Sequence, residues 1–357
     1  MRKTVTKKYD VVIGGGGVMG NSVAFWISQK TGGKARIAVV EKDPTLKGAA
    51  SSRSASSIRF QFTTPLNIQI GLFSGNFLRN LNTHLQLKDG ESVDVFFKEN
   101  GYLFLSSSQQ GERMLKNNCT TQKGFGAKVE VLEKRKLAEK FGWLNCEDLN
   151  CGSFGLEGEG FFDAGALVNS FKNKAKENNV DYLKDTISHF SLTQDKQAVE
   201  KVHLISGEEI ECGFYVNCTG TNGQTIVSAL DEKVGKKISF PVLAKKRQVF
   251  VFDCKDKRLK TGDGKQVEMP LTIDVTGLYW RSDSATKFIC GISPNEEEDD
   301  TPQLDDFQVD YSIFQERLWP ILAHRVPAFE NLKLHSAWYF FSFKKIPFLP
   351  LFKSLTS

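Results

Sequence analysis

In the N-terminal region, two continuous runs of apolar residues flank a stretch in which apolar residues recur at helical spacing. Tyr9 to Ile13 form a short continuous apolar run, and Ile37 to Val40 form a second one. Continuous apolar runs of β-forming residues are typical of strands buried on both faces of a parallel sheet. Between the runs, apolar residues recur at helical spacing at Val18, Met19, Val23, Trp26 and Ile27. The pattern therefore predicts a strand, a helix and a second parallel strand.

Along the rest of the chain, helices and strands are mixed as far as Gly220, and strands predominate from Pro241 onward. Helices are predicted over residues 67–82, 111–124, 133–141 and 307–322, and one more follows residue 163. Strands are predicted at residues 96–97 and 102–105, in short segments between 187 and 210, and in a run that ends at Gly220. From Pro241 onward strands follow one another until the last helix. This order predicts an α/β chain whose second domain is α+β, built on a mixed or antiparallel sheet.

Each of the two domains is predicted to consist of two pieces. A nucleotide-binding domain comprises residues 9–90 and 156–240. A substrate or cap domain comprises residues 91–155 and 241–335, and residues 339–357 are set apart as an atypical tail.

Four consecutive glycines follow the first predicted strand. The phosphate-binding pattern G-x-G-x-x-G fits only if it starts at Gly15, because a start one residue earlier places Met19 at the last glycine. Gly15 then permits the tight turn, Gly17 lets the backbone approach a pyrophosphate, and Gly20 lets the helix pack close to the strand. The start of the helix, at Val18 and Met19, offers free N–H groups to the phosphate.

An acidic residue, Glu41, ends the second predicted strand about 20 residues after the glycine turn, where a carboxylate accepts both ribose hydroxyls. Lys42 follows, and then a loop dense in serine, including Ser51 and Ser52, that can offer hydroxyl and N–H groups to a ligand. Together these features predict a Rossmann-like dinucleotide-binding domain. The alternative is a glycine-rich turn without a ligand.

Composition and charge exclude several classes of function. The 357 residues are 40% hydrophobic and 25% charged, which is ordinary for a soluble protein. The net charge is +5, and the basic clusters at 134–136 and 245–247 lack interleaved aromatic residues, so nucleic acid binding is not expected. Seven cysteines without a C-x-x-C motif favour free thiols, a reducing compartment and no metal site. No apolar stretch is long enough to cross a membrane.

The ordered set of motifs resembles the D-amino-acid, glycine and sarcosine oxidase family of FAD-dependent oxidoreductases. The set comprises the glycine turn, Glu41-Lys42, the serine loop at 51–57, EGFFD at 159–163 and VNCTG at 216–220. The resemblance runs from about Tyr9 to Trp338. It implies that the nucleotide is FAD and that its binding residues are Gly15, Gly17, Val18, Met19, Gly20, Glu41, Lys42, Ser51, Ser52, Ile187, Thr219 and Gly220.

The chemistry that this resemblance implies is oxidation of a C–N bond in a small amine or amino acid. An amino-acid carboxylate is best held by the planar fork of an arginine. Arg59, which ends the serine loop, and Arg281, which follows two aromatic residues, are the candidates for the catalytic site. The alternative for each is a structural ion pair.

Other functions stay open at this point. Resemblance to a mitochondrial member of the family implies a role in the assembly of respiratory complex I, with assembly intermediates as partners. The FAD would then be chiefly structural, and the protein a non-catalytic scaffold. The glycine turn alone also permits an NAD-dependent dehydrogenase, which the serine loop and the second glycine turn argue against. The basic start MRKTVTKK resembles the end of a mitochondrial presequence; a solvated leader and a cytoplasmic location are the alternative.

The C-terminal tail departs from the family pattern. From Tyr339 the sequence reads YFFSFKKIPFLPLFKSLTS, where the family continues with a turn rich in glycine and histidine that closes over the flavin ring. We interpret this tail as a truncated or misjoined C-terminus, which implies an inactive form. A native, membrane-touching tail is the alternative.

Overall fold

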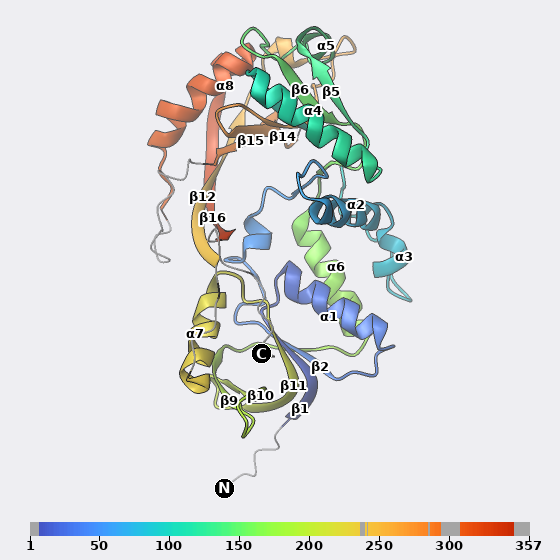
Figure 1. The fold of residues 1–357 in the computed structure, drawn as a ribbon, viewed down its shortest axis with the longest axis vertical. Coiled ribbons are helices and arrows are strands. Elements are labelled where there is room, and N and C mark those ends of the chain that lie inside the picture. The colour runs from blue at the N-terminus through green and yellow to red at the C-terminus, as the bar shows by residue number, and fades with distance from the viewer. Residues whose placement is uncertain (1–6, 236–239, 241, 285, 294–307, 346–357) are drawn as a thin grey trace.

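The computed structural model describes residues 7–235, 240, 242–284, 286–293 and 308–345. Among these residues the strands form a six-stranded sheet, an eight-stranded sheet and a short two-stranded ribbon. Figure 1 shows the two large sheets at opposite ends of an elongated molecule, with the long strands β12 and β16 running from one end toward the other. The predicted combination of a Rossmann-like domain with a second α+β domain is confirmed.

The six-stranded sheet has the strand order β8-β2-β1-β11-β10-β9. Its strands are β1 (Lys7–Gly14), β2 (Ile37–Val40), β8 (Asp181–Leu183), β9 (Ile187–Leu192), β10 (Val199–Leu204) and β11 (Glu209–Asn217). β1 pairs in parallel with both β2 and β11, so that Gly14 lies opposite Val40 on one side and Asn217 on the other. The carboxyl ends of these three strands therefore meet at one edge, where open α/β sheets bind nucleotides.

Helices cover both faces of this sheet. On one face, α1 (Val18–Lys30) and α6 (Ala164–Glu177) bury Phe25 and Phe171, and α2 (Pro65–Arg79) and α3 (Leu81–Leu85) extend the same core. On the other face, α7 (Gly223–Val234) packs through Ile226. Figure 1 shows α1 and α6 on the side of the sheet opposite α7.

The eight-stranded sheet has the order β16-β12-β15-β14-β13-β4-β6-β5, and only β13 and β4 pair in parallel. Its strands are β4 (Tyr102–Ser106), β5 (Val129–Glu133), β6 (Cys151–Gly155), β12 (Val242–Asp253), β13 (Leu271–Ile273), β14 (Leu278–Ser282), β15 (Lys287–Ile292) and β16 (Lys333–Lys345). One face buries Trp280, Phe250 and Phe288 against a π-helical turn (Phe314–Leu318), α8 (Trp319–Arg325) and a 3-10 turn (Pro327–Asn331). The helices α4 (Gln109–Gly124) and α5 (Lys134–Lys140) pack beside β5 and β6.

The long strand β16 contains the position at which the atypical tail was expected to begin. β16 pairs with β12 from Lys333 opposite Asp253 to Lys345 opposite Val242. Tyr339 lies inside this pairing, so residues 339–345 continue the eight-stranded sheet. The rest of the tail, residues 346–357, lies outside the described residues.

Three expected elements differ in the structure. Residues 96–97 are not a strand, because the Asp94 carboxylate accepts the N–H of Phe96 and holds that residue at a positive φ. The helix expected over 67–82 is broken at Asn80, whose side chain donates to the carbonyl of Asn76. Residue 307, where the last helix was expected to begin, lies outside the described residues. The described helix begins at Ser312, continues through a π-helical turn and ends at Arg325, before Pro327 as expected.

Candidate functional site

Two glycines of the turn are required because a side chain at either position would collide with the backbone of the protein. Gly15 has a φ of +97°, which disfavours any side chain, and a Cβ there would overlap the carbonyl oxygen of Cys218. A Cβ at Gly20 would overlap the carbonyl oxygen of Gly15. The first glycine makes the turn, and the last lets α1 pack against it, as the register that starts at Gly15 predicts.

Gly17 differs because the chain leaves open space beside it. A Cβ there would meet only the Ser51 hydroxyl oxygen, at 3.5 Å. This hydroxyl is buried and has no hydrogen-bond partner among the described residues. Gly17 is also the N-cap of α1, which begins at Val18 without a side-chain cap. An open face, an unsatisfied hydroxyl and free N–H groups at Val18 and Met19 fit the pyrophosphate of a dinucleotide.

Glu41 lies directly against the glycine turn. Its Oε2 accepts the N–H of Gly16 at 2.7 Å, and its Oε1 accepts the N–H of Asp43 at 2.8 Å. Each oxygen keeps a further lone pair for a ribose hydroxyl. Lys42 is exposed beside it.

The second glycine segment packs onto the first. The N–H of Cys218 donates to the carbonyl of Gly14 at 2.8 Å, and the Cα of Thr219 lies 3.0 Å from the Cβ position of Gly15. Gly220 follows with a φ of +60°. Ile187, at the start of β9, also lies beside this turn, with its Cδ1 3.0 Å from the Cβ position of Gly14. Ser52 lies with Ser51 in the 3-10 turn Ala50–Arg53. The fold therefore brings the predicted cofactor residues to one edge of the six-stranded sheet.

Arg59 lies in an aromatic bay, which we define as the rings of Phe62, Tyr102 and Phe104. Its guanidinium carbon is 4.7 Å from the ring centroid of Phe62, 5.3 Å from Phe104 and 5.8 Å from Tyr102. Within the described part of the chain, the guanidinium makes no hydrogen bond and no ion pair. All its N–H donors are therefore available to a ligand.

Arg281, the other predicted arginine, is occupied by the protein. Its side chain is almost fully buried and stacks on Phe161, with the guanidinium carbon 3.9 Å from the ring centroid. One terminal nitrogen donates to the carbonyl of Ser282 and to Asp283, and the other donates to the carbonyl of Ala55 at 2.9 Å. Burial lowers the pKa of Arg281 from its usual value. These contacts tie β14 to the serine loop.

Sequence reasoning missed a buried polar cluster that follows Arg59. The Glu159 carboxylate, fully buried, accepts hydrogen bonds from Phe60 and Gln61, and Ser153 donates to Gln61. Burial raises the pKa of Glu159 above the usual range of a carboxyl group. The motif EGFFD contains this glutamate, but its partners lie too far away in sequence for any spacing rule to connect them.

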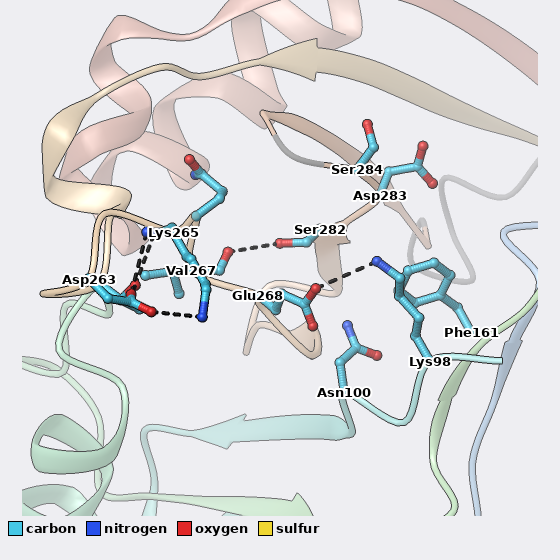
Figure 2. Close-up of a pocket in the computed structure, with 12 residues that line it drawn as sticks. Lys98, Asn100, Phe161, Asp263, Lys265, Val267, Glu268, Ser282, Asp283 and Ser284 are labelled. Carbon is cyan, nitrogen blue, oxygen red and sulfur yellow. Dashed lines mark hydrogen bonds and ion pairs between the residues drawn. The ribbon is translucent and has the colours of Figure 1, made fainter. Parts of the chain in front are cut away.

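A cavity of about 470 Å³ opens beside the loop that precedes β13. Figure 2 shows Lys98 and Glu268 on its wall, joined by an ion pair of 3.5 Å, with Asn100 and Phe161 nearby. None of the predicted cofactor or substrate residues lines it, although its wall includes Asp283, a partner of Arg281.

The comparison with protein families decides the assignment. Residues 10–353 match the DAO family, described as FAD dependent oxidoreductase. The chain belongs to this family. Its cofactor is therefore FAD, as the glycine turn and the resemblance predicted, and the open face at Gly17 with the buried Ser51 hydroxyl fits that group.

Relatives of this DAO-family chain cover nearly all of it. FAD-dependent oxidoreductase domain-containing protein 1 of Xenopus laevis is 36% identical over 93% of this chain and 69% of its own length. The protein of the same name from Bos taurus is 34% identical over 93% of this chain and 71% of its own length.

Solved structures of lower identity share the fold. L-proline dehydrogenase from P. horikoshii has a TM-score of 0.78 at 21% identity, covering 94% of this chain and 82% of its own. Glycine oxidase from Geobacillus kaustophilus has a TM-score of 0.74 at 21% identity, covering 97% and 85%.

No helix in the described ranges is both long and apolar enough to span a membrane. Within the same ranges, no three His, Cys, Asp or Glu residues lie together as a metal site would need.

Proposed function

We propose that this DAO-family chain uses FAD to oxidise the C–N bond of a small amine or amino acid that carries a carboxylate. Bound FAD supplies the hydride-accepting chemistry, and the protein supplies orientation and charge. The observation that carries the proposal is the guanidinium of Arg59. It lies over three aromatic rings and has no hydrogen-bond or ion-pair partner among the described residues.

The aromatic bay suits Arg59 to carboxylate binding for two reasons. The guanidinium fork can donate two parallel hydrogen bonds to one carboxylate, which gives both strength and orientation. The rings of Phe62 and Phe104 exclude water, and hydrogen bonds to charged groups are stronger where water is excluded. Burial also raises the pKa of Tyr102, so its phenol keeps its proton at neutral pH and adds no negative charge to the bay.

The names of proteins that share this fold support the same substrate class. They include glycine oxidase, L-proline dehydrogenase and L-amino acid deaminase, and each name contains an amino acid with a free carboxylate.

The test is anaerobic reduction of the bound flavin by a panel of amines. The panel pairs each amino acid with the amine that lacks its carboxylate, such as sarcosine with dimethylamine and proline with pyrrolidine. The proposal expects bleaching of the flavin absorbance by members of the carboxylated set and much slower bleaching by their partners. Equal rates within each pair, or no reduction by any member, would contradict it.

We propose as a second function that the chain acts in mitochondria in the assembly of respiratory complex I. The resemblance noted from the sequence supports this role, and one more distant relative is named pyruvate dehydrogenase phosphatase regulatory subunit, mitochondrial. Arg59 separates the two functions. In cells that lack the protein, a scaffold role expects Arg59→Ala to restore complex I as well as the wild type does. Failure of that variant, at equal protein and flavin levels, would contradict a purely structural role.

A further inference from the structure

The fully buried carboxylate of Glu159 holds the backbone that follows Arg59. Glu159 Oε1 accepts the N–H of Phe60 at 2.6 Å and the N–H of Gln61 at 3.1 Å. Glu159 Oε2 accepts the side-chain amide of Gln61 at 2.8 Å. Three donors from two consecutive residues therefore converge on one carboxylate immediately after the arginine.

Gln61 extends this hold to the eight-stranded sheet. Its Nε2 also donates to the carbonyl of Tyr102 on β4 at 3.1 Å, and its Oε1 accepts the hydroxyl of Ser153 on β6 at 2.7 Å. Tyr102 contributes one ring of the aromatic bay. The same network therefore fixes the backbone of the arginine segment and one of the rings over which the guanidinium lies.

The other side of Arg59 is fixed by a second set of contacts, which includes the two residues that directly follow Glu159. Just before the arginine, the ribbon strand β3 (Ser57–Ile58) pairs with β7 (Gly160–Phe161). The carbonyl of Arg59 itself lies close to Gly71 of α2, where a Cβ would come within 2.6 Å. Arg59 therefore lies between two fixed points, the ribbon before it and the Glu159 network after it.

A buried carboxylate is a costly way to hold a loop. Replacing buried ionic groups by packed apolar ones is often neutral or stabilising, so general stability does not explain Glu159. A fully satisfied polar network does specify one geometry, and that is useful where a side chain must meet a ligand within a fraction of an ångström.

We propose that Glu159 is a positioning residue, which fixes Arg59 in the orientation that binds the substrate carboxylate. The inference rests on the proposed function, because it assigns Arg59 the role of the carboxylate-binding group. Glu159 acts through the Phe60–Gln61 backbone and through Gln61, and it does not itself contact the substrate.

Two substitutions disturb the network in different ways. Glu159→Gln keeps the shape and one acceptor oxygen but turns an NH2 group toward the amide of Gln61. Gly155→Ala leaves Glu159 in place, but its methyl group would overlap the Glu159 carboxylate and displace it. The control is Glu99→Gln, because Glu99 also accepts a backbone N–H in this region, that of Gly158 at 2.7 Å. Among the described residues, its side-chain hydrogen bonds come from Gly158 and Arg79 and not from residues 60–61.

The experiment uses the FAD-loaded protein and two readouts. The first is hydrogen–deuterium exchange of the peptide that contains Phe60 and Gln61. The second is the dissociation constant of acetate, propionate and benzoate, measured by their perturbation of the flavin absorbance. For Glu159→Gln and Gly155→Ala we expect exchange at least about tenfold faster and carboxylate binding at least about tenfold weaker, with unchanged flavin content. The Glu99→Gln control should match the wild type in both readouts.

The outcomes separate the inference from the function on which it rests. If Arg59→Ala loses carboxylate binding but both network variants bind within twofold of the wild type, Glu159 does not position the arginine and the inference is overturned. Unchanged exchange at residues 60–61 in both network variants would overturn it as well. If instead Arg59→Ala binds the carboxylates as the wild type does, the proposed function fails.

Discussion

The cofactor edge of the six-stranded sheet and the aromatic bay around Arg59 are built in different ways. At the cofactor edge, the glycine turn and Glu41 come from one continuous segment, and the turn places backbone atoms where a phosphate needs them. In the bay, Arg59 meets Tyr102 and Phe104 from a strand of the other domain, and Glu159 holds the segment from a third place in the chain. A site formed by the backbone of one continuous segment can therefore be predicted from the sequence. A site formed by side chains from several segments is seen only in the folded structure.

Gly17→Val tests whether the glycine turn at the cofactor edge holds the pyrophosphate, and it should have the largest effect. The chain leaves room for a Cβ at Gly17, so we expect the protein to fold, but the valine side chain would occupy the space that the pyrophosphate requires. We expect loss of flavin retention, measured as the ratio of flavin to protein absorbance after gel filtration. Gly48→Val, at a loop glycine whose Cβ position contacts nothing, is the control. Normal flavin content in the Gly17 variant would show that the turn does not hold the pyrophosphate.

The eight-stranded sheet can be weakened without touching the cofactor edge. Arg325 is buried and donates to Asp274 at 2.7 Å and to Asp148 at 2.7 Å. Arg325→Met leaves the buried Asp274 without its partner, which costs about 3–5 kcal/mol when a buried ion pair is broken. Urea unfolding measures this free energy, with the exposed Arg135→Met as control. A loss below about 1 kcal/mol would mean that the pair contributes little to the fold.

Glu41→Ala tests the ribose contact and should have a smaller effect than Gly17→Val. Removing a carboxylate that accepts hydrogen bonds costs about 1.5–3 kcal/mol, or about 10- to 140-fold in the dissociation constant for FAD. Titration of the flavin-free protein with FAD measures it, and Glu200→Ala on the exposed side of β10 is the control. A change of less than about threefold would show that Glu41 does not bind the ribose.

The smallest effect concerns acid stability of the eight-stranded domain. The hydrogen bond from Arg325 holds the pKa of the Asp148 carboxyl below its usual value. A carboxyl whose pKa is depressed in the folded state contributes stability above its unfolded pKa of about 3.9, and this contribution is lost as pH falls through the lower folded value. As the pH is lowered from about 6 to 2, the urea concentration at the unfolding midpoint should therefore fall more steeply for the wild type than for Arg325→Met. Parallel curves would show that Asp148 gains nothing from the arginine.

The two regions also differ in how far the sequence predicted them. The positions of β1, α1 and β2 and the register from Gly15 follow from local periodicity and spacing, and the structure has them as expected. The sequence singled out both arginines but could not separate them, because only the fold shows that Arg281 is engaged by Ala55 and Asp283. Glu159 lies in the EGFFD motif, but nothing in the sequence indicated its contact with Gln61, since the two residues are close in space and remote in sequence.

The role of Arg59 is tested most directly by comparing the carboxylate preference of the wild type with that of Arg59→Ala. For one pair from the amine panel, the rate of anaerobic flavin reduction at limiting substrate is measured in both proteins at equal flavin content. We expect the flavin of the wild type to be reduced about tenfold faster or more by the carboxylated member, as a charge-assisted hydrogen-bonded pair supplies. Arg59→Ala should lose this preference, while its rate with the plain amine changes little. A preference that survives in Arg59→Ala would contradict the assignment of the aromatic bay as the substrate carboxylate site.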